Sequence, residues 1–209
     1  MSDAGRGRTV GLIDYQAGNI QSIDNALSHL GARVRRVLRA GDVAGCTHLV
    51  LPGVGAFGFC ADRLRASGLI DAVRRWALDE RRPLLGICVG MQLLADGSEE
   101  SPGSAGLGWI GGTVRRIAPG AGIRVPHVGW NTVEFVQPCG DFAAGAAADF
   151  YFDHSFAWEK PASGGVSGEC THGVRFCAVV RRENVVAAQF HPEKSQTAGL
   201  RFLGGFLRE

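Results

Sequence analysis

The chain has 209 residues, 45% of them hydrophobic and 20% charged, which is typical of one globular domain with a sizeable core. The formal net charge of +2 is too small to predict a nucleic-acid partner from electrostatics. The sequence has neither the apolar segment of a signal peptide nor an apolar run long enough to cross a membrane, so we predict a cytoplasmic protein with no membrane partner.

Strands and helices are predicted to alternate in the first half of the chain. After residues 1–8, which we expect to be a disordered tail, the domain is predicted to span residues 9–209. Runs typical of buried strands lie at 9–15, 48–53 and 83–88, and RVRRVL (33–38) suggests a further strand. Helical periodicity covers 20–31, 61–68, 69–80 and 89–97.

The second half is predicted to be mostly strands, at 112–118, 128–136, 149–156, 175–181 and 185–190, before a helix at 196–209. Residues 98–106 are rich in Ser, Gly and Glu and are expected to be a flexible surface loop. The whole pattern predicts an α/β fold: one domain with a central mixed, mostly parallel sheet flanked by helices.

Cys88 lies between two glycines, where the apolar run LLGI gives way to a helical pattern. A strand, then Gly-x-Cys-x-Gly, then a helix is the pattern of a nucleophile elbow, in which Gly86 and Gly90 let neighbouring backbone pass closely. The N-terminus of the following helix would favour the thiolate, and the N–H of Val89 could bind an oxyanion. A buried structural cysteine is the competing interpretation, because most free cysteines are core residues. The six cysteines form no CxxC pair, so we predict reduced thiols and no metal site.

A base for this nucleophile is predicted in the segment QFHPEKS, at the end of an apolar run. In extended backbone, residues two apart point the same way, so Glu193 could hold the imidazole of His191. A surface histidine beside a charge and a pair of metal ligands are the alternatives, although no third ligand has a suggestive spacing.

Gly53, Gly55 and Gly58 form the pattern G-x-G-x-x-G after a predicted strand. A dinucleotide-binding turn is one interpretation, but the acidic residue expected about 20 positions later would be Asp71, which lies in a predicted helix. The other interpretation, which we favour, is a loop beside Cys88 whose Gly53–Val54 peptide presents either its carbonyl or its N–H to an oxyanion.

Three segments together resemble the class I glutamine amidotransferases: GICVGMQLL (86–94), LPGVG (51–55) and QFHPEKS (189–195). Four more, IDYQAGNIQSI (13–23), SEES (98–101), PHVGWN (126–131) and YFDHSF (151–156), are similar to the glutaminase subunits of imidazole glycerol phosphate synthase in that family. The resemblance implies a flavodoxin-like fold and hydrolysis of L-glutamine without metal or cofactor. It also implies a heterodimer with a separate (β/α)8-barrel cyclase, which uses the ammonia to make imidazole glycerol phosphate and AICAR in histidine biosynthesis.

The resemblance also assigns roles to residues by position. The nucleophile, the base and its orienting carboxylate would be Cys88, His191 and Glu193. The oxyanion would be bound by Val89, Gly53 and Val54. Glutamine would be held by Gln92, His154, Ser155 and Phe156. The residues that meet the cyclase would be His127, Trp130, Asn131 and Lys194.

Two residues depart from the family pattern: Asp153 stands where a small apolar residue is common, and Phe156 where tyrosine is common. The same glutaminase chemistry serving an amidation step in a surface-sugar or other specialised pathway therefore stays an alternative. A Cys-dependent hydrolase acting alone and a non-catalytic nucleotide-binding module are two further alternatives.

Overall fold

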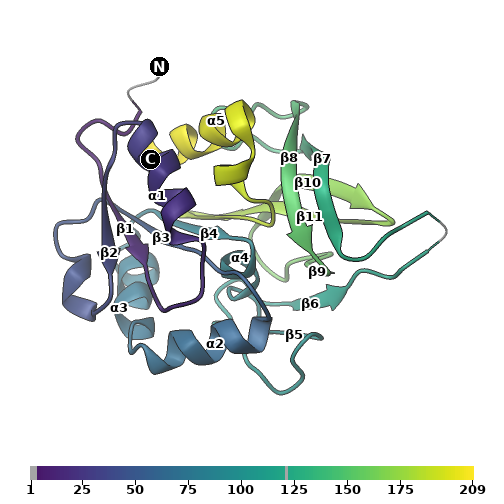
Figure 1. Cartoon of the computed structure of the whole chain (residues 1–209), viewed down its shortest axis with the longest axis horizontal. Helices are drawn as coiled ribbons and strands as arrows, with labels where there is room; N and C mark the ends of the chain where they lie inside the picture. Colours follow the sequence, from purple (N-terminus) through teal and green to yellow (C-terminus); the bar gives the residue numbers. More distant parts are fainter. Residues whose placement is uncertain (1–3, 121) are drawn as a thin grey trace.

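The computed structural model describes residues 4–120 and 122–209, and within them nine strands form one sheet in the order β2-β1-β3-β4-β12-β11-β10-β7-β8 (Figure 1). The parallel half comprises β1 (Thr9–Ile13), β2 (Arg33–Val37), β3 (His48–Leu51), β4 (Leu84–Ile87) and β12 (Val185–Ala188). The antiparallel half comprises β11 (Val174–Arg182), β10 (Gly165–His172), β7 (His127–Phe135) and β8 (Ala147–His154).

Helices cover both faces of the parallel half, because its central strands are apolar throughout: every residue of β3, β4 and β12 is buried. Figure 1 shows two helices on one side of these strands, α1 (Ile20–His29) and α5 (Gln196–Leu207). On the other side lie α2 (Phe57–Ala66) and α3 (Ile70–Arg74), which continues as a π-helical turn at Arg75–Asp79. The predicted α/β class, with a mixed sheet between helices, is confirmed.

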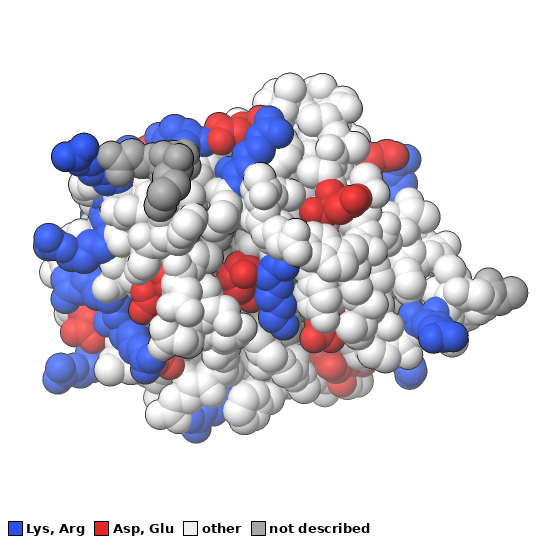
Figure 2. Space-filling view, turned by 45° about the horizontal axis from the view of Figure 1, so that its top comes forward, with Lys and Arg blue, Asp and Glu red and all other residues white. Residues whose placement is uncertain are grey.

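The two edges of the sheet are protected differently. Edge strand β2 exposes Arg33, Arg35 and Arg36, and Figure 2 shows Lys and Arg gathered at this end of the molecule. Such charges discourage pairing with another chain. At the other edge, Tyr151 of β8 accepts a hydrogen bond from the N–H of His191 at 2.9 Å. The antiparallel half therefore curls back so that β8 meets the chain that leaves β12.

The structure differs from the sequence-based prediction in several elements. Strand β10 was not predicted, because GVSGECTH lacks an alternating apolar pattern. The helix expected at 89–97 is only α4 (Val89–Gln92), because the carbonyls of Leu93 and Ala95 accept hydrogen bonds from Leu107 and Gly108 instead of continuing the helix. The segment then enters a small sheet of β5 (Gly97–Ser98), β6 (Thr113–Arg116) and β9 (Phe156–Ala157).

Part of the expected disordered tail, residues 1–3, lies outside the described residues. Residues 4–8 form a turn in which Gly5 is buried and donates a backbone hydrogen bond to Leu30 at 2.8 Å. This part of the tail is therefore packed on the domain. In the two stretches that the structure describes, no helix is long and apolar enough to span a membrane.

Candidate active site

Cys88 lies on a strained turn between β4 and α4. Its φ is 54° and its ψ is −113°, and its N–H donates to the carbonyl of Ala188 at the end of β12 (2.8 Å). A Cβ at Gly90 would lie 1.9 Å from the carbonyl oxygen of Leu51, so this position requires glycine. The nucleophile elbow predicted from the sequence is thus formed. Because α4 is a single turn, its dipole contributes less to a thiolate than the longer helix we expected.

His191 and Glu193 form a buried pair beside the thiol. Nδ1 of His191 lies 2.9 Å from Oε1 of Glu193, and the two side chains are 4% and 0% exposed. Burial favours the neutral imidazole, but hydrogen bonds with Cys88 and Glu193 outweigh it and raise the pKa of His191 to about 10. An imidazolium between a sulfur and a carboxylate is the arrangement of a Cys-His-Glu triad.

The backbone between His191 and Glu193 forms a turn, whereas we expected an extended chain. His191 is extended, but Pro192–Lys194 form one turn of 3₁₀-helix. Ser195 fixes this turn, because its Oγ donates to the carbonyl of His191 (2.6 Å) and accepts from the N–H of Tyr151 (2.9 Å).

A cavity of about 320 Å³ opens over the sulfur, within the size range of small-molecule sites. Among the residues with predicted roles, it is lined by Cys88, His191, Val54, Val89, Gln92, His154, Ser155, Phe156 and Lys194. Two carboxylate residues for which the sequence predicted no role, Glu100 and Asp153, also line it. The triad therefore faces a pocket with both basic and acidic side chains.

The glycine-rich loop that contains Gly53 and Val54 lies against the elbow in an arrangement that we call resting. The N–H of Val89 donates to the carbonyl of Gly53 at 3.3 Å, so the predicted donor next to the nucleophile is already occupied. A Cβ at Gly53 would lie 2.6 Å from the backbone N of Gly90, which shows how closely the loop approaches the elbow. In this arrangement the Gly53–Val54 peptide presents its carbonyl, not its N–H, toward the elbow.

Comparison with known proteins agrees with this geometry. Residues 11–208 match the family model described as Glutamine amidotransferase class-I. The chain belongs to this family. Membership makes it a glutamine-hydrolysing enzyme, and the strained Cys88 beside a buried histidine and glutamate fits the chemistry of the class.

Two curated relatives and one solved structure illustrate the similarity. The chain is 42% identical to imidazole glycerol phosphate synthase subunit HisH of Rhodospirillum rubrum, over 95% of this chain and 98% of that protein. It is 42% identical to the chloroplastic imidazole glycerol phosphate synthase hisHF of Arabidopsis thaliana over 95% of this chain, yet it spans only 34% of that longer protein. A crystal structure described as a glutamine amidotransferase has a TM-score of 0.75 at 24% identity, covering 95% of this chain and 96% of that one, and so shares the fold.

The glycine-rich loop at 52–58 leads into α2, and the backbone N–H groups at the start of that helix are not available to bind a dinucleotide. The N–H groups of Phe57 and Gly58, which open α2, donate to the carboxylate of Glu100 (2.7 Å) and the hydroxyl of Ser101 (3.0 Å). These are the groups that would hold a pyrophosphate. The same contacts attach Glu100 and Ser101 to α2, so the predicted surface loop at 98–106 is anchored there, while Pro102, Gly103 and Ala105 are exposed. The sequence analysis assigned no role to Glu100, although the motif SEES (98–101) was a signal from which one could have been predicted.

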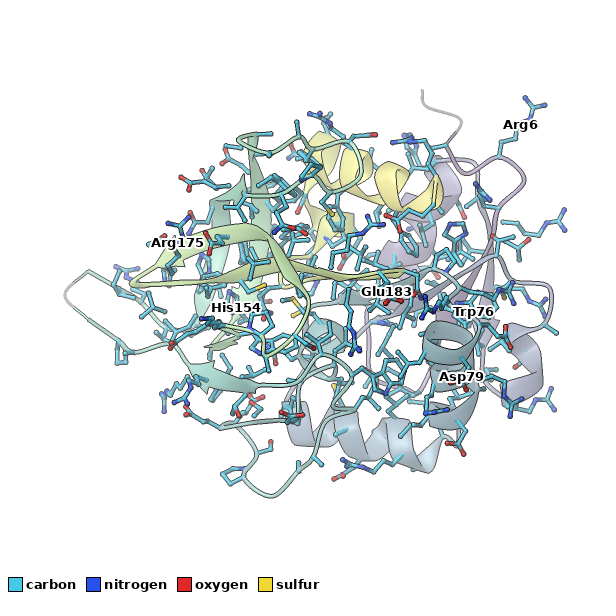
Figure 3. All side chains as sticks on the ribbon, turned by 180° about the vertical axis from the view of Figure 1, so that it is seen from behind. Arg6, Trp76, Asp79, His154, Arg175 and Glu183 are labelled. Carbon is cyan, nitrogen blue, oxygen red and sulfur yellow. The ribbon has the colours of Figure 1, made fainter. Side chains whose placement is uncertain are left out.

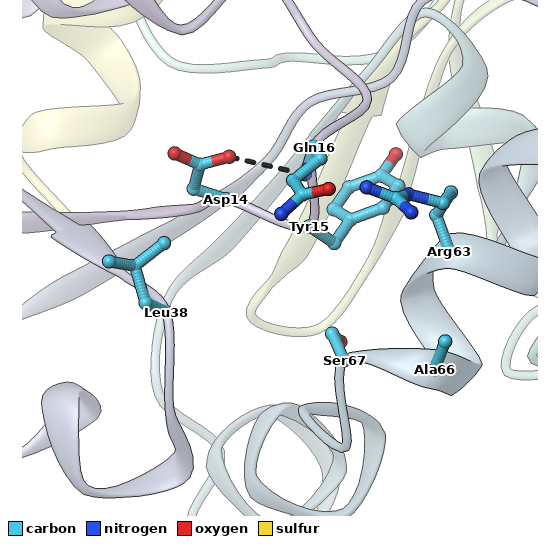
Figure 4. A pocket seen from close by; sticks show the side chains of 7 residues that line it. All are labelled: Asp14, Tyr15, Gln16, Leu38, Arg63, Ala66 and Ser67. Atoms are coloured by element: carbon cyan, nitrogen blue, oxygen red, sulfur yellow. Dashed lines mark hydrogen bonds between the residues drawn. The ribbon is translucent and has the colours of Figure 1, made fainter.

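Two side chains donate hydrogen bonds to backbone carbonyls on either side of Gly53 in this glycine-rich loop. The hydroxyl of Tyr15 donates to the carbonyl of Pro52 (2.6 Å), and the thiol of Cys60 donates to the carbonyl of Val54 (3.4 Å). Neither hydrogen bond involves the Gly53–Val54 peptide between these carbonyls, so this is the peptide that can rotate. Tyr15 also lines a second cavity of about 330 Å³ with Asp14, Leu38 and Arg63 (Figure 4), and neither cysteine nor histidine lines it.

Gln92, for which we predict a contact with substrate, lies in the wall of the active-site cavity, and it has a partner that the sequence did not suggest. Its Nε2 donates to the carbonyl of Phe156 and to Oε1 of Gln189, both at 3.0 Å. Nε2 of Gln189 lies 3.7 Å from the sulfur of Cys88. The signal for Gln189 was an amide at the end of the apolar run VVAA, where a fully buried polar side chain requires partners.

The predicted partner-binding residues divide into two groups. Trp130 is 49% exposed, and Lys194 lies at the cavity with its Nζ 5.3 Å from the centre of the Tyr151 ring. His127, by contrast, is 4% exposed, and Asn131 turns its amide inward to His127. Because β7 alternates sides, the ring of His127 faces the core, and the predicted place of His127 at a partner interface stays a prediction.

Proposed function

We propose that this chain is the glutaminase subunit of an imidazole glycerol phosphate synthase, which hydrolyses L-glutamine and delivers ammonia to a partner cyclase. The observation that carries the chemistry is the strained Cys88 in contact with the buried His191–Glu193 pair, at the floor of a cavity. The similarity to the HisH subunit over nearly the whole of both chains supports the choice of pathway.

The reaction proceeds through a thioester on Cys88. The thiolate attacks the side-chain amide carbon of glutamine, and His191 protonates the nitrogen as the C–N bond breaks, which releases ammonia. His191 then takes a proton from water, whose oxygen attacks the thioester and releases glutamate and the thiolate. Glu193 orients the imidazole and balances its positive charge through both steps.

The charged side chains that line the cavity are complementary to the charged groups of a free amino acid. The carboxylates of Glu100 and Asp153 match the α-ammonium group, and Lys194 balances the α-carboxylate at the mouth. Gln92, Ser155 and Phe156 form the wall against which the substrate backbone lies.

The surface that we propose for the partner comprises exposed side chains at and near this cavity. Val54, Val128 and Trp130 are large apolar side chains that are 46–55% exposed. Val54 and Lys194 line the cavity, Val128 pairs with the lining residue Asp153, and the rings of Trp130 and Tyr151 are in contact next to Lys194. Exposed apolar side chains beside a site favour a protein interface. The Arabidopsis relative is about three times as long as this chain, so its remaining length has room for a (β/α)8 cyclase in the same polypeptide.

The experiment is reconstitution with the candidate cyclase. Glutamate release and imidazole glycerol phosphate formation are measured for the subunit alone, with bare cyclase, and with cyclase carrying its ligand. We expect glutamine to support product formation only in the complex. Full glutaminase activity of the subunit alone would instead favour a stand-alone hydrolase, and glutaminase activation by a different acceptor enzyme would favour a specialised amidation pathway.

A further inference from the structure

A chain of hydrogen bonds crosses the antiparallel half, from β10 to the wall of the active-site cavity. Nδ2 of Asn131 donates to the carbonyl of Thr171 (3.0 Å) and lies 3.1 Å from Nε2 of His127. Nδ1 of His127 lies 2.9 Å from Nε2 of His154, whose Nδ1 lies 2.9 Å from the carbonyl oxygen of Phe156. We call Asn131, His127 and His154 the histidine relay. Figure 3 shows His154 within this half of the molecule, and His154 also lines the active-site cavity.

The direction of donation along the relay is fixed by its ends. The carbonyl of Phe156 can only accept, so His154 carries its hydrogen on Nδ1 and accepts at Nε2. His127 must then donate from Nδ1, which leaves its Nε2 as the acceptor for the amide of Asn131. The amide orientation is set independently, because the N–H of Thr132 donates to Oδ1 of Asn131 at 2.8 Å.

Both histidines must be neutral for this pattern, since an imidazolium has no acceptor. Burial lowers the pKa of His127 to about 3 and that of His154 to about 4. The ring of His127 is also enclosed by stacking on His172 (centroids 3.9 Å apart) and on Phe152 (4.7 Å).

The relay ends on an atom that also belongs to the catalytic site. The carbonyl of Phe156 accepts from Gln92 as well as from His154, and Gln92 in turn donates to Gln189, whose amide contacts the sulfur of Cys88. The Ser155–Phe156 segment of the cavity wall is therefore fixed by two hydrogen bonds to one carbonyl, one from the relay and one from Gln92.

We propose that His127 and Asn131 are positioning residues for glutamine, which hold the Ser155–Phe156 wall of the cavity in place through His154. The inference rests on the proposed glutaminase function and adds to it two residues that do not touch the substrate. Both lie on β7, which also exposes Val128 and Trp130, so one strand connects the proposed partner surface to the substrate wall.

The first test is spectroscopic and needs no activity. Long-range ¹H–¹⁵N correlation spectra of the full chain with ¹⁵N-labelled histidine distinguish the two neutral tautomers and the imidazolium. At pH 7 we expect the Nδ1–H tautomer for both His127 and His154, assigned with the variants below. An Nε2–H tautomer or an imidazolium at either position would overturn the relay.

The second test separates positioning from packing. Asn131→Asp keeps the size of the side chain but replaces the donor facing His127 with an acceptor, and His127→Phe keeps the stacked ring but removes both nitrogens. In the complex with ligand-loaded cyclase, each variant should raise the KM for glutamine about threefold to tenfold, the effect of losing one buried hydrogen bond, with kcat within about twofold.

The matched control is His172→Phe, which preserves the aromatic stack on His127 but lies outside the relay. Its KM should stay within about twofold of the wild-type value. Wild-type KM in Asn131→Asp, or an equal rise in His172→Phe, would overturn the positioning role. If the wild-type complex fails to hydrolyse glutamine, the proposed function fails, while the tautomers still test the relay.

Discussion

Replacing Val54 with proline removes the backbone N–H of residue 54. This is the group that the Gly53–Val54 peptide would present to an oxyanion after the peptide plane rotates. In the structure this peptide presents its carbonyl, which accepts from the N–H of Val89 at 3.3 Å. In the active arrangement we expect the peptide to rotate, which frees the Val89 N–H and brings in the N–H of Val54. The proline ring closes on the backbone nitrogen of residue 54, whose N–H does not face the elbow here, and the residue itself is 46% exposed.

The size of the effect follows from the number of donors lost. One oxyanion donor is typically worth about 2.7–4 kcal/mol, or about 10²–10³ in kcat. Val54→Pro should therefore lower the glutaminase rate of the complex with ligand-loaded cyclase by about 10²–10³. The rate of the isolated subunit should fall far less, because the Val54 N–H does not face the elbow in the resting arrangement.

The assay is steady-state glutamate release by the isolated subunit and by the loaded complex, with binding of the cyclase checked separately. Val54→Ala is the matched control, since it shortens the same side chain but keeps the N–H, and it should be activated nearly as well as the wild type. Normal activation of Val54→Pro would refute the proposed turning of this peptide.

The remaining predictions concern the triad. Cys88→Ser should fold and dock but lose glutamine-dependent synthesis while still using added ammonium, and residual glutaminase activity within tenfold of wild type would contradict the assignment. A glutamine-mimicking electrophile should label Cys88 in preference to Cys60 and Cys139, whose pKa values burial raises to about 11; peptide mass spectrometry identifies the labelled site. For Glu193→Gln, the loss in free energy of unfolding should be largest below about pH 6.5 and should shrink toward pH 10, because the raised pKa of His191 stabilises the fold only while the imidazole is protonated. Denaturant titrations across this pH range measure the difference, and a loss independent of pH would show that Glu193 does not stabilise the imidazolium.

Local sterics and periodicity allowed the sequence alone to predict much of this protein. Gly86 and Gly90 around Cys88 predicted the elbow, because a tight strand-to-helix turn requires small neighbours whatever the rest of the fold is. The two-residue spacing of His191 and Glu193 predicted their contact, although the intervening chain is a 3₁₀ turn. The apolar runs of the first half predicted the parallel strands for the same local reason.

Other features depend on residues far apart in the chain, so only the tertiary structure decided them. Parallel pairing of β12 with β4 places His191 beside a cysteine about 100 residues earlier, and the curl of the antiparallel half brings Tyr151 to the backbone of His191. The carbonyl of Gly53 meets Val89 because two loops cross at Gly90, and no local pattern sets that orientation. His127 lies in the core while Trp130 of the same motif faces outward, because strand pairing with β8 fixes which side of β7 is buried.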